Sequence, residues 1–163
     1  NADQEVASIY KKNKNCFKRL KKNLPKYFSV FPANKIQIIK AIEDSEKNLK
    51  KITKIIHPEV RKKLSTFLKK NKNRKVIILD IPLLLENKLN QKKDIIIFVE
   101  SKKSEIVKRL KKRDNFNLKL YNQFKKIQLP LSYKKKKSNH IIKNNFTNKL
   151  VKISVNKILK KII

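Results

Sequence analysis

Two carboxylates, Asp80 and Glu86, are the first candidates for a binding site, because they bracket the sequence Pro-Leu-Leu-Leu. Residues 76–79 form a short apolar run, rich in β-branched side chains, that is typical of a strand buried on both faces of a parallel sheet. Asp80 stands where that strand would end, and Pro82 argues against a central strand continuing further. Since open α/β sheets bind ligands at the carboxyl ends of their strands, the pattern predicts a pocket rim. A strand followed by the start of a partly buried helix fits the same residues equally well.

Two arginines, Arg109 and Arg113, form a second candidate group, because they lie one helical turn apart and can face one ligand. The alternative is a pair of solvated helix arginines. That alternative is weakened because arginine is so rare in this Lys-rich chain, where it occurs only as Arg19, Arg61, Arg74, Arg109 and Arg113.

Asp3 and His57 each have a structural and a functional interpretation. Asp3 lies in a predicted helix over residues 1–10, which its side chain can cap. His57 directly precedes Pro58, and a lone histidine in this position is more often a packed or capping residue than a substrate contact.

The elements that must position these side chains alternate between strands and helices. Strands are predicted at residues 75–80, 94–99 and 139–143, which implies an α/β fold with right-handed crossovers and a parallel sheet. The predicted helices cover residues 1–10, 35–42, 45–57, 59–70, 104–113, 117–128 and 147–162. Residues 11–31 are expected to form a short helix followed by irregular chain. Ser45, Ser104 and Thr147 are expected to cap three of them, and the helix that begins after Ser45 is expected to end at His57-Pro58.

The formal net charge of +33 is the most extreme property of the 163 residues. It would attract any polyanion, and the aromatic residues among the lysines of segment 17–31 are compatible with single-stranded nucleic acid. Nearly all of the positive charge is lysine, however, whereas arginine dominates specific recognition of phosphates and bases. We therefore favour a solvated lysine surface over a dedicated nucleic-acid face, and a Lys-rich nucleic-acid-binding protein stays the alternative.

Several absences narrow the class of protein. The chain contains no glycine, so these residues hold no Gly-rich phosphate loop. Cys16 is the only cysteine, which excludes an internal disulfide and a multi-cysteine metal site. No apolar run approaches the roughly 20 residues that span a bilayer. We expect a single domain over residues 1–163, a cytoplasmic location and no membrane partner.

The order of the signals along the whole chain resembles the dephospho-CoA kinase family. The resemblance is carried by Asn1-Ala-Asp-Gln, His57-Pro58, Leu79-Asp-Ile-Pro-Leu-Leu-Leu-Glu86, Arg109-Leu-Lys-Lys-Arg113-Asp114, Gln128-Leu-Pro130 and His140-Ile-Ile-Lys-Asn144. It implies a P-loop kinase-like three-layer fold. It also implies transfer of the ATP γ-phosphate to the ribose 3′-hydroxyl of dephospho-CoA, the last step of coenzyme A synthesis, with Mg²⁺ as the metal.

The resemblance also implies roles for individual residues. Asp3 would be the catalytic residue that accepts or orients the 3′-hydroxyl proton. Residues 1–70 would form a helical substrate-side region and residues 100–130 a lid-like helical region. The lid and ATP side would include Arg109, Arg113 and Asn144, and the acceptor side would be formed by His57, Asp80, Pro82, Leu83 and Glu86. No residue is predicted as a metal ligand.

The chain departs from the family at its start. Asn1 stands where the family has the first acid of Asp-Ala-Asp. The family's first two strands and its Gly-rich loop ending in Gly-Lys-Ser are not among these residues. Our hypothesis is therefore a truncated kinase domain that is inactive without the loop, and whose loop is encoded in frame upstream of Asn1. A degenerate remnant of the kinase without activity is the alternative.

Overall fold

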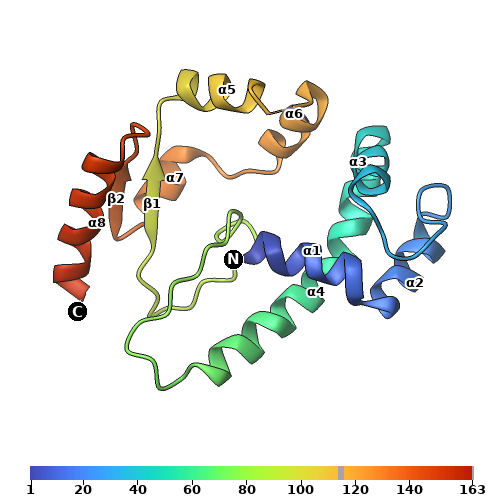
Figure 1. The fold of residues 1–163 in the computed structure, drawn as a ribbon, viewed down its shortest axis with the longest axis horizontal. Helices are drawn as coiled ribbons and strands as arrows, with labels where there is room; N and C mark the ends of the chain where they lie inside the picture. Colours follow the sequence, from blue (N-terminus) through green and yellow to red (C-terminus); the bar gives the residue numbers. More distant parts are fainter. Residues whose placement is uncertain (114–115, 163) are drawn as a thin grey trace. The chain divides into compact units, whose positions relative to one another are not determined.

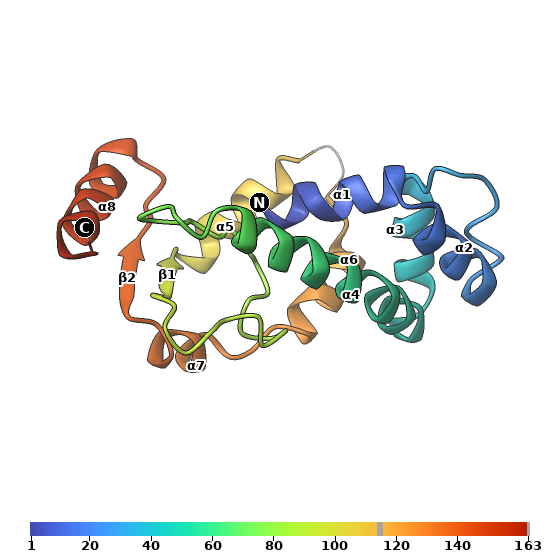
Figure 2. The ribbon, with the colours of Figure 1, turned by 90° about the horizontal axis from the view of Figure 1, so that it is seen from below.

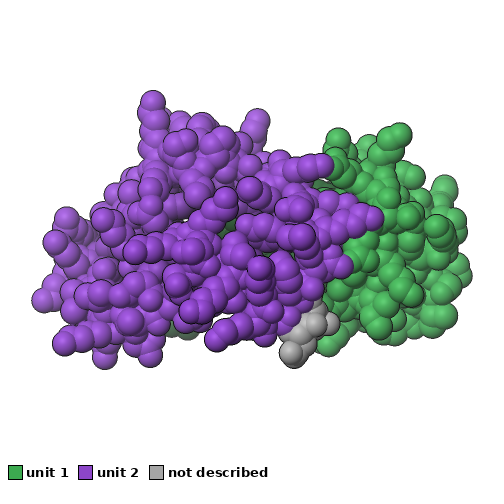
Figure 3. All heavy atoms as spheres, turned by 90° about the horizontal axis from the view of Figure 1, so that it is seen from above, with its two compact units in different colours: residues 1–84 green, residues 85–163 purple. Residues whose placement is uncertain are grey.

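The computed structural model describes residues 1–113 and 116–162, which fall into two compact units. The first unit comprises Asn1–Leu84, and the second begins at Leu85 (Figure 3). We describe each unit separately. The single-domain organisation predicted for residues 1–163 stays a prediction, because two compact units can belong to one domain or to two.

The first unit is helical and contains α1 (Ala2–Lys12), α2 (Lys14–Asn23), α3 (Lys35–Asp44) and α4 (Glu46–Lys70), as Figure 1 shows. The first three helices pack against α4, which is the longest. Their apolar stripes meet in a core that excludes water, and this burial is the main force that holds the unit together. The buried core side chains include Ile9, Leu20, Phe28, Ile42, Ile52, Ile55 and Ile56.

The break predicted at His57-Pro58 is wrong, because α4 continues through Pro58 to Lys70. Proline removes one helical hydrogen bond, at a cost of roughly 3 kcal/mol. The side chains of Val60, Leu64 and Leu68 continue the apolar stripe of the first half and are partly buried. Packing against α1 therefore compensates for the lost hydrogen bond. The predicted start is confirmed, since the Ser45 side chain accepts a hydrogen bond from the Lys47 N–H at 3.1 Å.

The strand predicted at residues 75–80 is also wrong. These residues, all within the described part of the chain, form no strand, and the Val76 and Ile78 side chains are 38% and 80% exposed. A strand requires a neighbour to pair with. Here the segment is held to another element by a hydrogen bond from the Ala2 N–H to the Asp80 carbonyl at 2.9 Å. Residues 76–79 therefore have the apolar composition of a buried strand but pair with no neighbouring strand.

The second unit contains the parallel sheet. It consists of β1 (Ile97–Glu100), α5 (Lys103–Lys111), α6 (Leu118–Lys126), α7 (Leu131–Lys136), β2 (His140–Lys143) and α8 (Asn148–Ile162). The two strands pair in parallel, with Ile97 opposite His140 and Glu100 opposite Lys143. Helix α8 lies beside β2 in both ribbon views (Figures 1 and 2), and Ile142 and Ile158 are buried.

The α/β class and the parallel strand pair are confirmed, but the described residues form two strands instead of three. The strand predicted at 139–143 matches β2, and the one predicted at 94–99 is shifted, since β1 begins at Ile97. Ser104 does not cap α5, whose N-cap is Lys102 without a side-chain hydrogen bond. In the described chain, no helix combines the length and the apolar character needed to cross a membrane.

Candidate functional site

A group of three residues at the start of α1, which we call the Asn1 cluster, comprises Asn1, Asp3 and Asp80. The Oδ1 atom of Asn1 accepts hydrogen bonds from the backbone N–H groups of Asp3 and Gln4 at 2.9 and 3.2 Å. The Nδ2 atom of the same side chain donates to Oδ2 of Asp80. Asn1, and not Asp3, is therefore the cap of α1, which corrects the structural interpretation of Asp3.

Asp3 is exposed in the first turn of α1, where the unpaired N–H groups of a helix favour negative charge. Because its backbone N–H is used by the cap, the backbone of Asp3 is tied to Asn1. Within the described residues, no side chain donates a hydrogen bond to this carboxylate. An exposed carboxylate on a backbone that is held in this way can accept a proton from a bound hydroxyl group.

Three residues predicted on the acceptor side lie elsewhere in the first unit. His57 is half-buried in the middle of α4, where burial, together with the positive charge of Arg61 one helical turn away, lowers the pKa of its imidazole. Pro82 and Leu83 lie in the irregular turn that follows Asp80.

Glu86, the last residue predicted on the acceptor side, is held within the second unit. Its carboxylate lies 2.5 Å from the Lys134 ammonium and accepts a hydrogen bond from the Leu129 N–H at 3.1 Å. Burial alone would raise the pKa of Glu86, but the hydrogen bonds from Lys134 and from the backbone outweigh it and hold the pKa below its ordinary value. Glu86 therefore anchors the start of the second unit to Lys134 and Leu129. Nothing in the sequence around Pro82 predicts Lys134 as the partner of Glu86.

A second group, which we call the edge cluster, lies where the two parallel strands end and comprises Arg109, Asn144 and Phe146. The Asn144 N–H donates to the Glu100 carbonyl at 2.7 Å, which extends the ladder beyond β2. The Asn144 side chain accepts from the Phe146 N–H at 2.7 Å. The Arg109 guanidinium, from α5, stacks over the Phe146 ring at 3.9 Å from its centroid.

Arg109 and Asn144 thus both contact Phe146, the first through its ring and the second through its backbone N–H. Phe146 has a φ of 64°, a backbone conformation that is costly for a side chain with a Cβ atom. Arg113 is exposed just beyond α5, and Asp114 lies outside the described residues.

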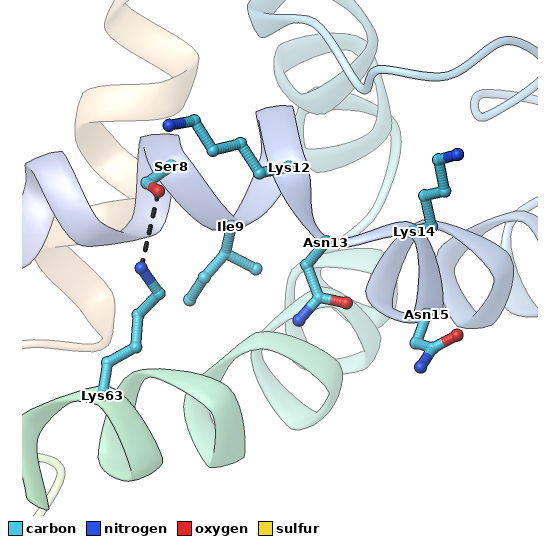
Figure 4. Close-up of a pocket in the computed structure, with 7 residues that line it drawn as sticks. All are labelled: Ser8, Ile9, Lys12, Asn13, Lys14, Asn15 and Lys63. Carbon is cyan, nitrogen blue, oxygen red and sulfur yellow. Dashed lines mark hydrogen bonds between the residues drawn. The ribbon is translucent and has the colours of Figure 1, made fainter. Parts of the chain in front are cut away.

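A hollow of about 440 Å³ lies in the first unit, lined by Ser8, Ile9, Lys12, Asn13, Lys14, Asn15 and Lys63 (Figure 4). Lys63 donates to Ser8 at 3.4 Å and pairs with Glu5 at 2.6 Å, which neutralises one of its three cations. None of the predicted site residues lines this hollow. Its donors and cations suit an anion, but they include no acid or base for catalysis.

A metal site was not predicted. Among residues 1–113 and 116–162, no group of three or more His, Cys, Asp or Glu side chains is arranged to hold a metal ion. Mg²⁺ in kinases is bound by one or two carboxylates together with substrate phosphates.

Comparison with known proteins gives a consistent result. The family model for dephospho-CoA kinase matches residues 1–149. Proteins named dephospho-CoA kinase from the Wolbachia of Brugia malayi and from Wolbachia pipientis wMel are 31% and 30% identical to the chain. These alignments cover 86% and 92% of this chain and 73% and 77% of the relatives. A dephospho-CoA kinase from Prochlorococcus marinus is 33% identical over 78% of the chain and 59% of the relative.

Proposed function

The chain belongs to the dephospho-CoA kinase family, a family of phosphate-transferring enzymes, and from this premise we propose that it phosphorylates the ribose 3′-hydroxyl of dephospho-CoA with ATP. The products are coenzyme A and ADP. The hydroxyl oxygen attacks the γ-phosphorus, the bond between that phosphorus and the β–γ bridging oxygen breaks, and ADP leaves with the bonding electron pair. The hydroxyl proton passes to a nearby base.

The observation that carries this proposal is the exposed carboxylate of Asp3 on a backbone that Asn1 holds. Phosphoryl transfer depends mostly on positioning and on charge stabilisation, and it needs a base beside the acceptor hydroxyl. Asp3 stands at the position of the second acid of the family motif, and Asn1 holds its backbone in place. In this proposal Asp3 accepts the 3′-hydroxyl proton.

The edge cluster supports the nucleotide side of the proposal. Asn144 directly follows β2, at the end of the sheet where parallel strands bind ligands, and Arg109 of α5 stacks on Phe146 two residues further on. We propose that Arg109 and Arg113 bind the negatively charged phosphates of ATP and that Asn144 contacts the nucleotide. Mg²⁺ would arrive with the ATP phosphates, and we assign none of the described side chains to it as a ligand.

The remaining requirement is a loop of backbone N–H groups around the β- and γ-phosphates. These residues include no glycine, and the three relatives compared above are longer than the matched region. We propose that residues encoded upstream of Asn1 supply this loop. DNA sequence upstream of the Asn1 codon that encodes Gly-x-x-x-x-Gly-Lys-Ser in frame supports this part of the proposal, and a start codon directly before Asn1 contradicts it.

The test is an assay for coenzyme A formed from ATP and dephospho-CoA, run on the printed chain and on any upstream-extended form. We expect product that depends on Mg²⁺ and on both substrates. Asp3→Asn should reduce kcat by about a hundredfold or more while the Kd for dephospho-CoA stays within about twofold. Asp94→Asn, the same change at a carboxylate that accepts a hydrogen bond from Gln91 N–H, is the matched control. Equal losses in kcat and binding for Asp3→Asn would make Asp3 a binding residue.

The second candidate, nucleic-acid binding, rests on the charge of +33 and on the lysines of the hollow. Salt separates the two functions. A polyanion binder with 6–10 phosphate contacts loses roughly 10³–10⁵ in affinity between 50 and 200 mM salt. We expect only weak binding to a mixed-sequence DNA duplex even at 50 mM salt, whereas tight binding at 50 mM that is lost at 200 mM would favour the second candidate.

A further inference from the structure

We propose that Asp80 is a positioning residue that sets the orientation of Asp3 through Asn1, and does not itself bind substrate. This inference rests on the proposed function, because it concerns the base of that reaction. It replaces the role that Asp80 has in the sequence resemblance, where the residue belongs to the acceptor side.

Asp80 contacts the start of α1 through both its backbone carbonyl and its carboxylate. Its backbone carbonyl accepts the Ala2 N–H at 2.9 Å, and its carboxylate accepts the Asn1 side-chain amide. These contacts join two segments that are 79 residues apart in the chain. Asp80 therefore fixes the point where α1 begins, and Asp3 lies in the turn that follows.

Asn1 is the connection, because its amide both donates and accepts. Oδ1 faces the N–H groups of Asp3 and Gln4, and Nδ2 faces the Asp80 carboxylate. A flipped amide would turn like groups toward each other at both ends, so the hydrogen-bond partners determine the orientation. An aspartate at position 1 could cap the helix but would repel Asp80, whereas asparagine satisfies both partners.

Asp3 is the first-turn carboxylate that this arrangement leaves available. The other acid of the turn, Glu5, pairs with Lys63 at 2.6 Å, and the hydrogen bond and charge of Lys63 lower the pKa of Glu5. Within the described residues, Asp3 has no such cation partner. The ion pair removes Glu5 as a competing base, while the contact between Asn1 and Asp80 orients Asp3.

The first arm of the test needs no activity and uses the full chain. NMR measures the exchange of the Asp3 and Gln4 amide protons with water. Asp80→Ala, and separately Asn1→Asp, should speed this exchange by about threefold to tenfold, as expected for loss of a helix-cap contact. The double variant Asn1→Asp with Asp80→Asn reverses donor and acceptor, and should return exchange to within about twofold of wild type. Asp94→Ala is the matched control and should leave these amides unchanged.

The second arm measures kcat and KM for dephospho-CoA on the form of the protein that catalyses the transfer. Asp80→Ala should lower kcat by about tenfold or more with KM nearly unchanged, because a base displaced by a fraction of an ångström loses rate and not binding. The reversed pair should recover most of the loss, which an independent substrate ligand would not do.

The two arms separate the failure of this inference from the failure of the proposed function. A raised KM with normal kcat in Asp80→Ala would overturn the positioning role and make Asp80 a substrate ligand. Failure of the reversed pair to restore amide exchange would also overturn it. A wild-type protein that transfers no phosphate in any form contradicts the proposed function, and amide exchange then decides whether Asp80 sets the first turn of α1.

Discussion

The Lys134 ammonium lies 2.5 Å from the Glu86 carboxylate, and only 12% and 9% of these two side chains are exposed. The pair ties the start of the second unit to α7. Glu86→Ala would leave a nearly buried ammonium without its partner, so we expect a loss of about 3 kcal/mol in the free energy of unfolding. Urea unfolding monitored by circular dichroism measures this loss. Glu105→Ala, which removes an exposed carboxylate from α5, is the control and should change stability by less than about 0.5 kcal/mol.

The same pair predicts a pH dependence at the acid end. The folded pKa of Glu86 lies below its ordinary value of 4.5, so the folded protein holds the ionised carboxylate more strongly than the unfolded chain does. This contribution is fully present above pH 4.5 and is lost as the pH falls through the lower folded pKa. Melting temperatures from pH 6 to pH 3 should therefore fall less steeply in Glu86→Gln than in wild type. Parallel curves for the two proteins would mean that ionisation of Glu86 does not contribute to stability.

The stacking of Arg109 on Phe146 predicts an unusual order of variants. Phe146→Ala should lose about 0.5–1 kcal/mol of stability, the typical value of an exposed cation–π contact. Phe146→Gly removes the same contact but also relieves the positive φ of 64°, so it should be about 1 kcal/mol more stable than Phe146→Ala. Chemical unfolding of the three proteins gives this order. Alanine more stable than glycine would show that residue 146 leaves the left-handed region.

His57 predicts a second and separate pH effect. Burial and the charge of Arg61 hold the folded pKa of His57 below 6.5, so the unfolded chain takes up the proton first as the pH falls. The stabilising effect of neutral His57 is complete above pH 6.5 and decreases below it, down to the folded pKa. His57→Gln should weaken the loss of melting temperature between pH 7.5 and pH 5.5. An NMR titration that places the His57 pKa at or above 6.5 would refute this prediction.

Pro58 interrupts the hydrogen bonds of α4 while the helix continues around it. Pro58→Ala restores the missing N–H donor and removes the clash of the ring with the preceding turn. We expect the free energy of unfolding to rise by about 1–3 kcal/mol, together with a small gain in helical circular dichroism. A destabilised Pro58→Ala variant would show that the proline ring contributes packing worth more than the restored hydrogen bond.

Local sequence was sufficient where a neighbour in the chain determines the structure. Ser45 was recognised as a helix cap because its partner is the N–H of Lys47, two residues away. The strand at 140–143 was recognised from a short apolar run between polar residues. Residues 76–79 have the same apolar pattern, but pairing depends on a second strand that composition does not encode, and these residues are unpaired in the structure.

For the candidate site, the order of motifs along the chain was enough to identify the family and to single out Asp3, Arg109 and Asn144, because these signals lie in short stretches. Their partners come from distant positions. Asp80 meets Asn1 across 79 residues, Lys134 meets Glu86, and Phe146 meets Arg109. Such contacts form only when helices and strands pack together. Local sequence offers many lysines, asparagines and aromatic residues as possible partners, and only the tertiary structure determines which of them comes into contact.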